Sequence, residues 1–254
     1  MKIREIISSG KNLEYQFSDG STLLMIACAH NSLADVKELL NASANSNHVR
    51  HDGMTSLMIA CYNGFFRIFD ELMKHNPKIN AQSELGWTAL HYACLKYRSQ
   101  LDALYGHDYS HLPIVKALAQ NGANINIKST DDQSAFITAI SRGNTDLALY
   151  LLEIGAEYRQ KTNKEGCTPL MVAAEQGDLL ILKKLIGRGA EINDRDDNGR
   201  TAIFAAIRGQ HTDAIKLLLN AGADVRVRDN DGDTPLTFSE WLKNDEAVTL
   251  ISNP

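Results

Sequence analysis

One stretch of the chain, residues 163–193, reads NKEGCTPLMVAAEQGDLLILKKLIGRGAEIN. Thr168 followed by Pro169 is typical of a helix start, because the Thr hydroxyl caps free N–H groups and Pro fits the first helical position. A short helix is therefore expected, and after Gly177 a second helix with apolar residues at helical spacing. Gly189 is expected to end that helix. One such helix pair cannot bury its own apolar face, so copies of it must stack.

The same pattern recurs along the whole chain. Each copy places a Thr or Ser between a Gly-like residue and a small and then a large apolar residue, at Thr22, Thr55, Thr88, Ser134, Thr168, Thr201 and Thr234. These anchors are spaced by 33, 33, 46, 34, 33 and 33 residues. A Gly-Ala pair or a degenerate form of it follows each of the first six anchors by 21 residues, except in the third copy, where the distance is 34. The third copy therefore holds a 13-residue insertion.

These residues resemble the ankyrin repeat family, most fully over 163–193 and also at Trp87–Cys94 and Asp231–Leu236. The resemblance implies an all-α ankyrin-repeat solenoid of stacked helix-turn-helix pairs with β-turn fingers. We expect a single domain over residues 1–254, with the insertion near 97–112. Its parts are an N-terminal partial cap, 1–16, repeats at 17–49, 50–82, 83–128, 129–162, 163–195 and 196–228, and a C-terminal cap, 229–254.

Composition and motifs exclude several classes of protein. The formal net charge is −5, whereas nucleic-acid-binding chains are usually basic, so no nucleic-acid partner is expected. No apolar run approaches the 18 residues of a membrane span, and the N-terminus lacks the apolar core of a secretion signal. We expect a cytoplasmic protein, or one delivered to a host cytosol by a signal-independent route. With no P-loop, nucleophile elbow or paired-His zinc helix, no enzyme activity, cofactor or metal is predicted.

The cysteines follow the repeat. Cys28, Cys61 and Cys94 each stand six residues after an anchor and are predicted to be buried as small apolar groups. Cys167 precedes its Thr and is expected to be exposed on a finger, where a reactive thiol is the alternative.

Two polar patterns have competing interpretations. His107 and His111 could share a metal if their segment were helical, but no third ligand is near, so a surface loop with two solvated His is favoured. The basic residues Arg159, Lys161 and Lys164 crowd one finger, which is read as solvated, with a patch for an acidic partner as the alternative.

Asparagines recur after the Gly-Ala marker, at Asn47, Asn80, Asn126 and Asn193. One interpretation is a set of modification sites. The favoured one is that each Asn binds backbone groups and holds the finger turn.

The resemblance also implies where a partner binds. In ankyrin repeats this is the concave face, made by the fingers and by the exposed side of the first helix of each pair. Copies two and three place aromatic and apolar residues there, which favours a binding surface because exposed apolar patches usually mark one. The expected partner-binding residues are His51, Met54, Tyr62, Asn63, Glu84, Leu85, Trp87, Lys96, Tyr105, Tyr109, Gln133 and Arg142. The alternative is that Trp87 lies flat on its neighbours and only packs; Trp241 is interpreted as packing on the last helix pair.

The sequence thus predicts a protein–protein interaction module, monomeric when unbound, that binds another protein by occlusion or scaffolding. It would act either as an inhibitor or immunity-type protein or as an effector. The alternative is an enzyme-associated subunit or a modifying enzyme whose chemistry lies in the 97–112 insertion.

Overall fold

The computed structural model describes residues 12–95, 111–162 and 165–252. Over these residues the regular secondary structure is helical, apart from one isolated bridge between Val49 and Thr55, so the predicted all-α ankyrin-repeat fold is confirmed. No helix in the described ranges is long and apolar enough to cross a membrane. The chain divides into two compact units, residues 1–130 and 131–254.

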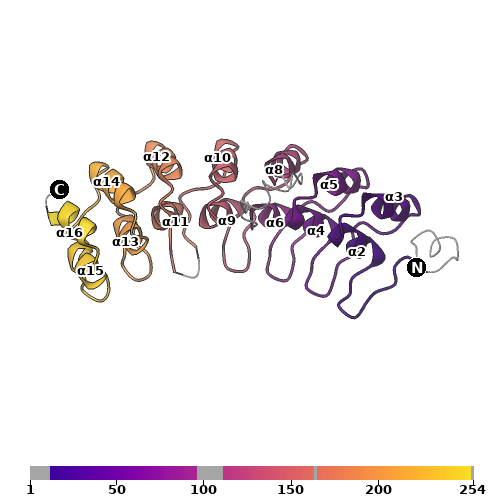
Figure 1. Cartoon of the computed structure of the whole chain (residues 1–254), viewed down its shortest axis with the longest axis horizontal. Helices are drawn as coiled ribbons and strands as arrows, with labels where there is room; N and C mark the ends of the chain where they lie inside the picture. The colour runs from indigo at the N-terminus through magenta and orange to yellow at the C-terminus, as the bar shows by residue number, and fades with distance from the viewer. Residues whose placement is uncertain (1–11, 96–110, 163–164, 253–254) are drawn as a thin grey trace. The chain divides into compact units, whose positions relative to one another are not determined.

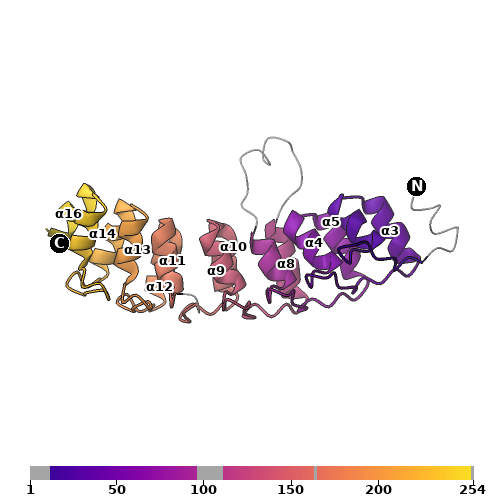
Figure 2. The same ribbon diagram turned by 90° about the horizontal axis from the view of Figure 1, so that it is seen from below.

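Each unit is a stack of helix pairs whose first helices lie in one row and whose second helices lie in another (Figure 1). In unit 1 the first helices are α2 (Leu23–Ala29), α4 (Ser56–Asn63) and α6 (Ala89–Leu95), and the second are α3 (Leu33–Asn41), α5 (Phe66–Met73) and α8 (His111–Gln120). In unit 2 the first helices are α9 (Ala135–Ser141), α11 (Pro169–Gln176), α13 (Ala202–Arg208) and α15 (Pro235–Trp241), and the second are α10 (Thr145–Glu153), α12 (Leu179–Gly187), α14 (Thr212–Asn220) and α16 (Asp245–Ser252). The loops between successive pairs run along one edge of each unit (Figure 2).

The anchor residues start the first helices, as predicted. Hydroxyl groups accept a hydrogen bond from the backbone N–H three residues later at Thr22, Thr55, Ser134, Thr168 and Thr234. In the third copy the Thr88 N–H donates instead to His91 Nδ1, at 3.2 Å. Thr201 differs, because its buried Oγ1 has no hydrogen-bond partner among the described residues.

Small residues let the first helices approach closely. Ala60, Ala93 and Ala173 are completely buried, and so are Cys28, Cys61 and Cys94, which confirms the predicted burial of these three thiols. Burial raises the pKa of the Cys28 and Cys94 thiols to about 12, so both remain protonated at neutral pH.

Three of the four recurring asparagines, Asn47, Asn80 and Asn193, bind backbone groups as predicted, but those of the next repeat rather than of their own finger turn. Asn47 Nδ2 donates to the Asn76 carbonyl at 3.3 Å, and its Oδ1 accepts from the Lys78 N–H at 2.7 Å. Asn80 and Asn193 make the equivalent pairs of bonds one repeat further along. We call this series the asparagine ladder.

Helix α8 has His111 as its first residue and Pro113 as its third. Pro is tolerated there because the N–H groups of the first turn have no intrahelical partner. The His111 Nε2 lies 3.4 Å from the Tyr62 carbonyl, so the prediction of a solvated loop is wrong for His111. His107 lies outside the described residues, among which no group of three metal-binding side chains occurs.

Candidate partner-binding face

Two fingers of unit 1 form the base of the predicted site. In the finger that precedes Thr88, the Ser83 N–H donates to the Trp87 carbonyl at 2.9 Å, which closes the turn. Neighbouring fingers are joined as well, since the Glu84 N–H donates to the Asp52 carbonyl at 3.0 Å. Gly53 has a φ of +81°, and a Cβ there would lie 2.5 Å from the Glu84 nitrogen. Gly is therefore required for the fingers to stack this closely.

Three aromatic side chains come together above these fingers; we call Tyr62, Trp87 and Tyr92 the unit 1 aromatic group. The Tyr92 ring meets Tyr62 edge-on at 6.3 Å and Trp87 at 5.5 Å. The buried Tyr92 hydroxyl donates to Ser83 Oγ at 3.2 Å. Such contacts add to the apolar area that the rings bury, so the group is held in place.

Exposure differs among the predicted residues of this face. Leu85 is 58% exposed and Tyr62 is 39% exposed, whereas Trp87 is half-buried because it also packs on His91. His51 and Glu84 are exposed as well. Tyr62 and Trp87 thus both pack on Tyr92, and Leu85, two residues before Trp87, adds an exposed apolar side chain; we call Leu85, Tyr62 and Trp87 the unit 1 apolar patch.

The remaining unit 1 residues of the predicted set serve partly structural roles. Met54 is half-buried, and its sulfur lies 3.0 Å from Arg50, which also pairs with Asp52. The hydrogen bond from Arg50 is the largest cause that lowers the pKa of Asp52. The Asn63 amide donates to the Ile59 carbonyl at 2.9 Å.

The other predicted residues lie in unit 2 or outside the described residues. Gln133 and Arg142 belong to unit 2. Lys96, Tyr105 and Tyr109 lie outside the described residues, as does most of the insertion on which an enzyme role would depend.

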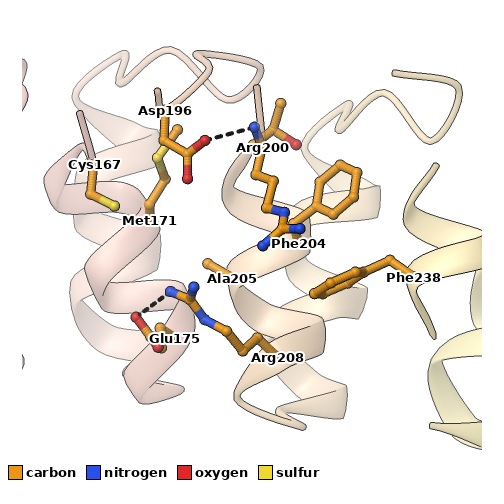
Figure 3. A pocket seen from close by; sticks show the side chains of 10 residues that line it. Cys167, Met171, Glu175, Asp196, Arg200, Phe204, Ala205, Arg208 and Phe238 are labelled. Atoms are coloured by element: carbon orange, nitrogen blue, oxygen red, sulfur yellow. Dashed lines mark hydrogen bonds and ion pairs between the residues drawn. The ribbon is translucent and has the colours of Figure 1, made fainter. Parts of the chain in front are cut away.

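Unit 2 contains a pocket that the sequence did not predict. It lies between α11, α13 and α15 and is lined by Cys167, Met171, Glu175, Asp196, Arg200, Thr201, Phe204, Ala205, Arg208 and Phe238 (Figure 3). On one wall Arg208 pairs with Glu175 at 2.9 Å, which joins α13 to α11. Phe204 and Phe238 were not found from the sequence, because neither stands at one of the positions expected to contact a partner. Their apolar character at helical spacing was visible.

Arg200 clamps two fingers and a ring together. Its Nε lies 2.9 Å from Asp229 Oδ2, its Nη2 lies 3.2 Å from Asp231, and its guanidinium stands 4.8 Å from the centre of the Phe238 ring. Burial raises the pKa of Asp229, but the hydrogen bonds from Arg200 and from the Asp233 and Asp231 N–H groups outweigh it, so the pKa is lower than usual. We call Arg200 with Asp229 and Asp231 the Arg200 clamp.

A second aromatic group lies beside the clamp; the unit 2 aromatic group is Phe204, Phe238 and Trp241. Phe238 contacts Phe204 at 5.4 Å and stacks on Trp241 at 6.1 Å. Trp241 remains 74% exposed although its ring stacks on Phe238, so the interpretation that it mainly packs is wrong.

Cys167 is half-buried in the pocket rather than exposed on its finger. Burial, together with the carboxylates of Asp196 and Glu165, raises the pKa of its thiol to about 11, against an opposing effect of Arg208. A protonated thiol is a poor nucleophile, which disfavours the reactive-thiol alternative.

The basic finger of unit 2 is partly tied to its neighbour. Arg159 donates to the Gly189 carbonyl at 3.3 Å, and Lys161 donates to the Arg195 carbonyl at 2.7 Å. Lys164 lies outside the described residues. These bonds give the two described cations a structural role that the solvated-finger interpretation did not include.

Comparison with known families matches the profile for ankyrin repeats (3 copies) to residues 3–83, 24–110, 101–196 and 170–253. The chain belongs to the ankyrin repeat family. Its ankyrin repeats also superpose on the crystal structure of the human ASB11 ankyrin repeat domain with a TM-score of 0.77 and 24% identity, covering 92% of this chain and 99% of that one, a likeness of fold alone.

Curated relatives share shorter ankyrin-repeat segments. Protein HOS4 of Saccharomyces cerevisiae is 32% identical over 96 residues, which cover 38% of this chain and 8% of HOS4. Ankyrin repeat and SOCS box protein 6 of Mus musculus is 34% identical over 92 residues, 35% of this chain and 22% of that protein. The matched segments thus span less than a quarter of these relatives. The ankyrin repeats make the chain a protein–protein interaction module, on a fold typical of non-enzymatic scaffolds.

Proposed function

We propose that the chain binds a partner protein through the finger and first-helix face of unit 1, with Leu85, Tyr62 and Trp87 at the centre. The observation that carries this proposal is the exposure of Leu85, 58%, and of Tyr62, 39%, in a finger and a first helix of unit 1 that also expose polar residues such as Glu84. An apolar centre surrounded by polar groups is the usual composition of a protein interface. The occupant is an apolar surface of a folded partner protein.

The patch is ready to bind without rearrangement. The hydrogen bond between Tyr92 and Ser83 holds the rings, and the bond between Glu84 and Asp52 holds the fingers. A surface that is already ordered loses little conformational entropy on binding, so more of the contact energy appears as affinity. This suits a protein that acts by covering a partner's surface, as an inhibitor, an immunity-type protein or an effector would.

Two leucines with equal exposure provide a matched test. Leu85 lies on the proposed face, whereas Leu180 lies on the second helix α12, and both are 58% exposed. The tagged full chain and its Leu85→Ala, Trp87→Ala and Leu180→Ala variants are used to capture partners from a lysate of the source organism. Stoichiometric partners are identified by mass spectrometry and their affinities are measured with purified protein.

We expect Leu85→Ala and Trp87→Ala each to weaken partner binding about tenfold or more, because central apolar contacts dominate interfaces. Leu180→Ala should change the affinity by less than about twofold, since scattered surface contacts contribute little. Circular dichroism checks that every variant is folded. If Leu180→Ala lost the partner while both unit 1 variants kept it, the proposed face would be wrong.

A further inference from the structure

Unit 2 carries a second exposed aromatic surface, which the proposed function does not use. Trp241 is 74% exposed and stacks on Phe238, which in turn contacts Phe204. Trp and Tyr rings are favoured contact residues at interfaces because they offer a large area at a small entropic cost. An exposed indole that stacks on a buried ring is therefore a candidate contact point for a ligand.

The finger and first-helix positions of copies five to seven, in the same unit as this ring, carry more acids than cations. One, three and four residues before each anchor, and seven and eight residues after it, these copies hold five acids and three cations. The acids are Glu165, Glu175, Asp197, Asp231 and Asp233, and the cations are Lys164, Arg200 and Arg208. Arg200 pairs with Asp229 and Asp231, and Arg208 pairs with Glu175. Because five acids stand against three cations, these positions together have a net negative charge.

The acids are held in fixed positions. The Asp197 N–H donates to the Glu165 carbonyl at 2.9 Å, and the Asn230 N–H donates to the Asn198 carbonyl at 2.9 Å. These bonds join three successive fingers. The Asp231 side chain is 75% exposed and is held by Arg200, whose guanidinium lies over the Phe238 ring. Negative charge is thus placed rigidly beside the aromatic group.

We propose that this acidic and aromatic surface of unit 2, centred on Trp241, binds a basic segment of a partner protein in which Arg or Lys alternate with apolar residues. Carboxylates attract the cations, and Trp is the aromatic residue with the strongest cation–π interaction. The contact between Arg200 and Phe238, at 4.8 Å, already places a guanidinium on a ring of the same surface. Because this surface belongs to unit 2 alone, the inference stands independently of the proposed unit 1 site.

The experiment uses Trp241 as its own reporter. The chain has two Trp residues, so the full chain with Trp87→Phe leaves only Trp241 to fluoresce. It is titrated with three synthetic peptides of equal length in which Leu alternates with Arg, with Gln or with Glu. We expect the Arg peptide to change the Trp241 fluorescence and to bind about tenfold or more tightly than the other two. Its affinity should fall as salt is added, because exposed charges are screened.

Matched charge variants test the site by calorimetry. The face variant is Asp197→Asn with Asp231→Asn; Arg200 keeps its bond to Asp229 in this variant. The control is Asp146→Asn with Asp213→Asn, which removes the same charge from exposed positions on the second helices α10 and α14. We expect the face variant, and separately Trp241→Ala, to weaken binding of the Arg peptide about tenfold. The control should weaken it by less than about twofold.

Two results would overturn the proposal. One is a Glu or Gln peptide that binds as tightly as the Arg peptide, which would mean that charge does not select the ligand. The other is an equal loss of Arg-peptide affinity in the face and control variants, which would mean that only the net charge of the protein matters. Loss of partner capture by Leu85→Ala is a separate outcome, because it concerns unit 1.

Discussion

The two aromatic groups are held by different chemistry at equivalent positions of the repeat. In unit 1, Ser83 stands five residues before its anchor and accepts a hydrogen bond from Tyr92. In unit 2 the equivalent position holds Asp229, which pairs with Arg200, and the Arg200 guanidinium lies over the Phe238 ring. One scaffold therefore holds its aromatic group by a hydrogen bond between uncharged groups in unit 1 and by the ion pairs of the Arg200 clamp in unit 2. The difference indicates that the fingers determine how each surface responds to pH, while the helices provide the common frame.

The largest effect is expected when the Arg200 clamp is broken. Asp229→Asn should destabilise unit 2 by about 2 kcal/mol, because Arg200 loses a charged partner in a buried setting. The native pKa of Asp229 is lowered, so its contribution is fully present above the unfolded pKa of about 4 and is lost as the pH falls through the lower native pKa. Urea denaturation followed by Trp241 fluorescence in a Trp87→Phe background, near pH 7 and about pH 3, measures this.

Asp213→Asn is the control for that prediction, since Asp213 is exposed on α14 and pairs only with Lys216 three residues later in the described structure. It should change the free energy of unfolding by less than about 0.5 kcal/mol. A stability difference between Asp229→Asn and the wild type that persists undiminished in acid would show that the charge of Asp229 is not what anchors this unit.

A smaller effect is expected when the hydrogen bond between Tyr92 and Ser83 is removed. Tyr92→Phe should cost about 1 kcal/mol, because it removes one hydrogen bond but leaves the ring contacts with Tyr62 and Trp87. The loss should be the same near pH 7 and about pH 3, since the hydrogen bond joins two uncharged hydroxyl groups. Urea denaturation followed by Trp87 fluorescence in a Trp241→Phe background reports on unit 1. A loss of stability that depends on pH would show that the contribution of Tyr92 is not a hydrogen bond between uncharged groups.

The smallest effect concerns the helix start beside the Arg200 clamp. Thr201→Val should leave the stability within about 0.5 kcal/mol of wild type or raise it, because the buried Thr201 hydroxyl has no hydrogen-bond partner among the described residues. Thr168→Val should cost about 1 kcal/mol, since Thr168 Oγ1 accepts from the Met171 N–H. Thermal unfolding of the two variants compares them directly. Equal losses of stability in the two variants would show that the Thr201 hydroxyl also stabilises the start of its helix.

The parts of the structure that depend on local spacing were predictable. Thr168 and Pro169 start a helix, and Cys28 is buried, because neighbours along the chain and the repeat period determine these features. The Arg200 clamp was not predictable, since its partner Asp229 is 29 residues away and the pairing depends on how two fingers stack. Trp241 was misread for the same reason: exposure depends on packing between elements, which its local pattern does not contain.

The asparagine ladder has a consequence for how such a chain changes during evolution. Asn47 and Asn193 each reach backbone groups 29 and 31 residues ahead, whereas Asn80 reaches groups 42 and 44 residues ahead with the same two bonds. The difference is the 13-residue insertion of the third copy, which the ladder simply spans. Because the Asn reads only peptide N–H and carbonyl groups, almost any neighbouring sequence satisfies it. When whole copies are duplicated, deleted or enlarged, the asparagine bonds can therefore form again without new residues having to evolve to receive them.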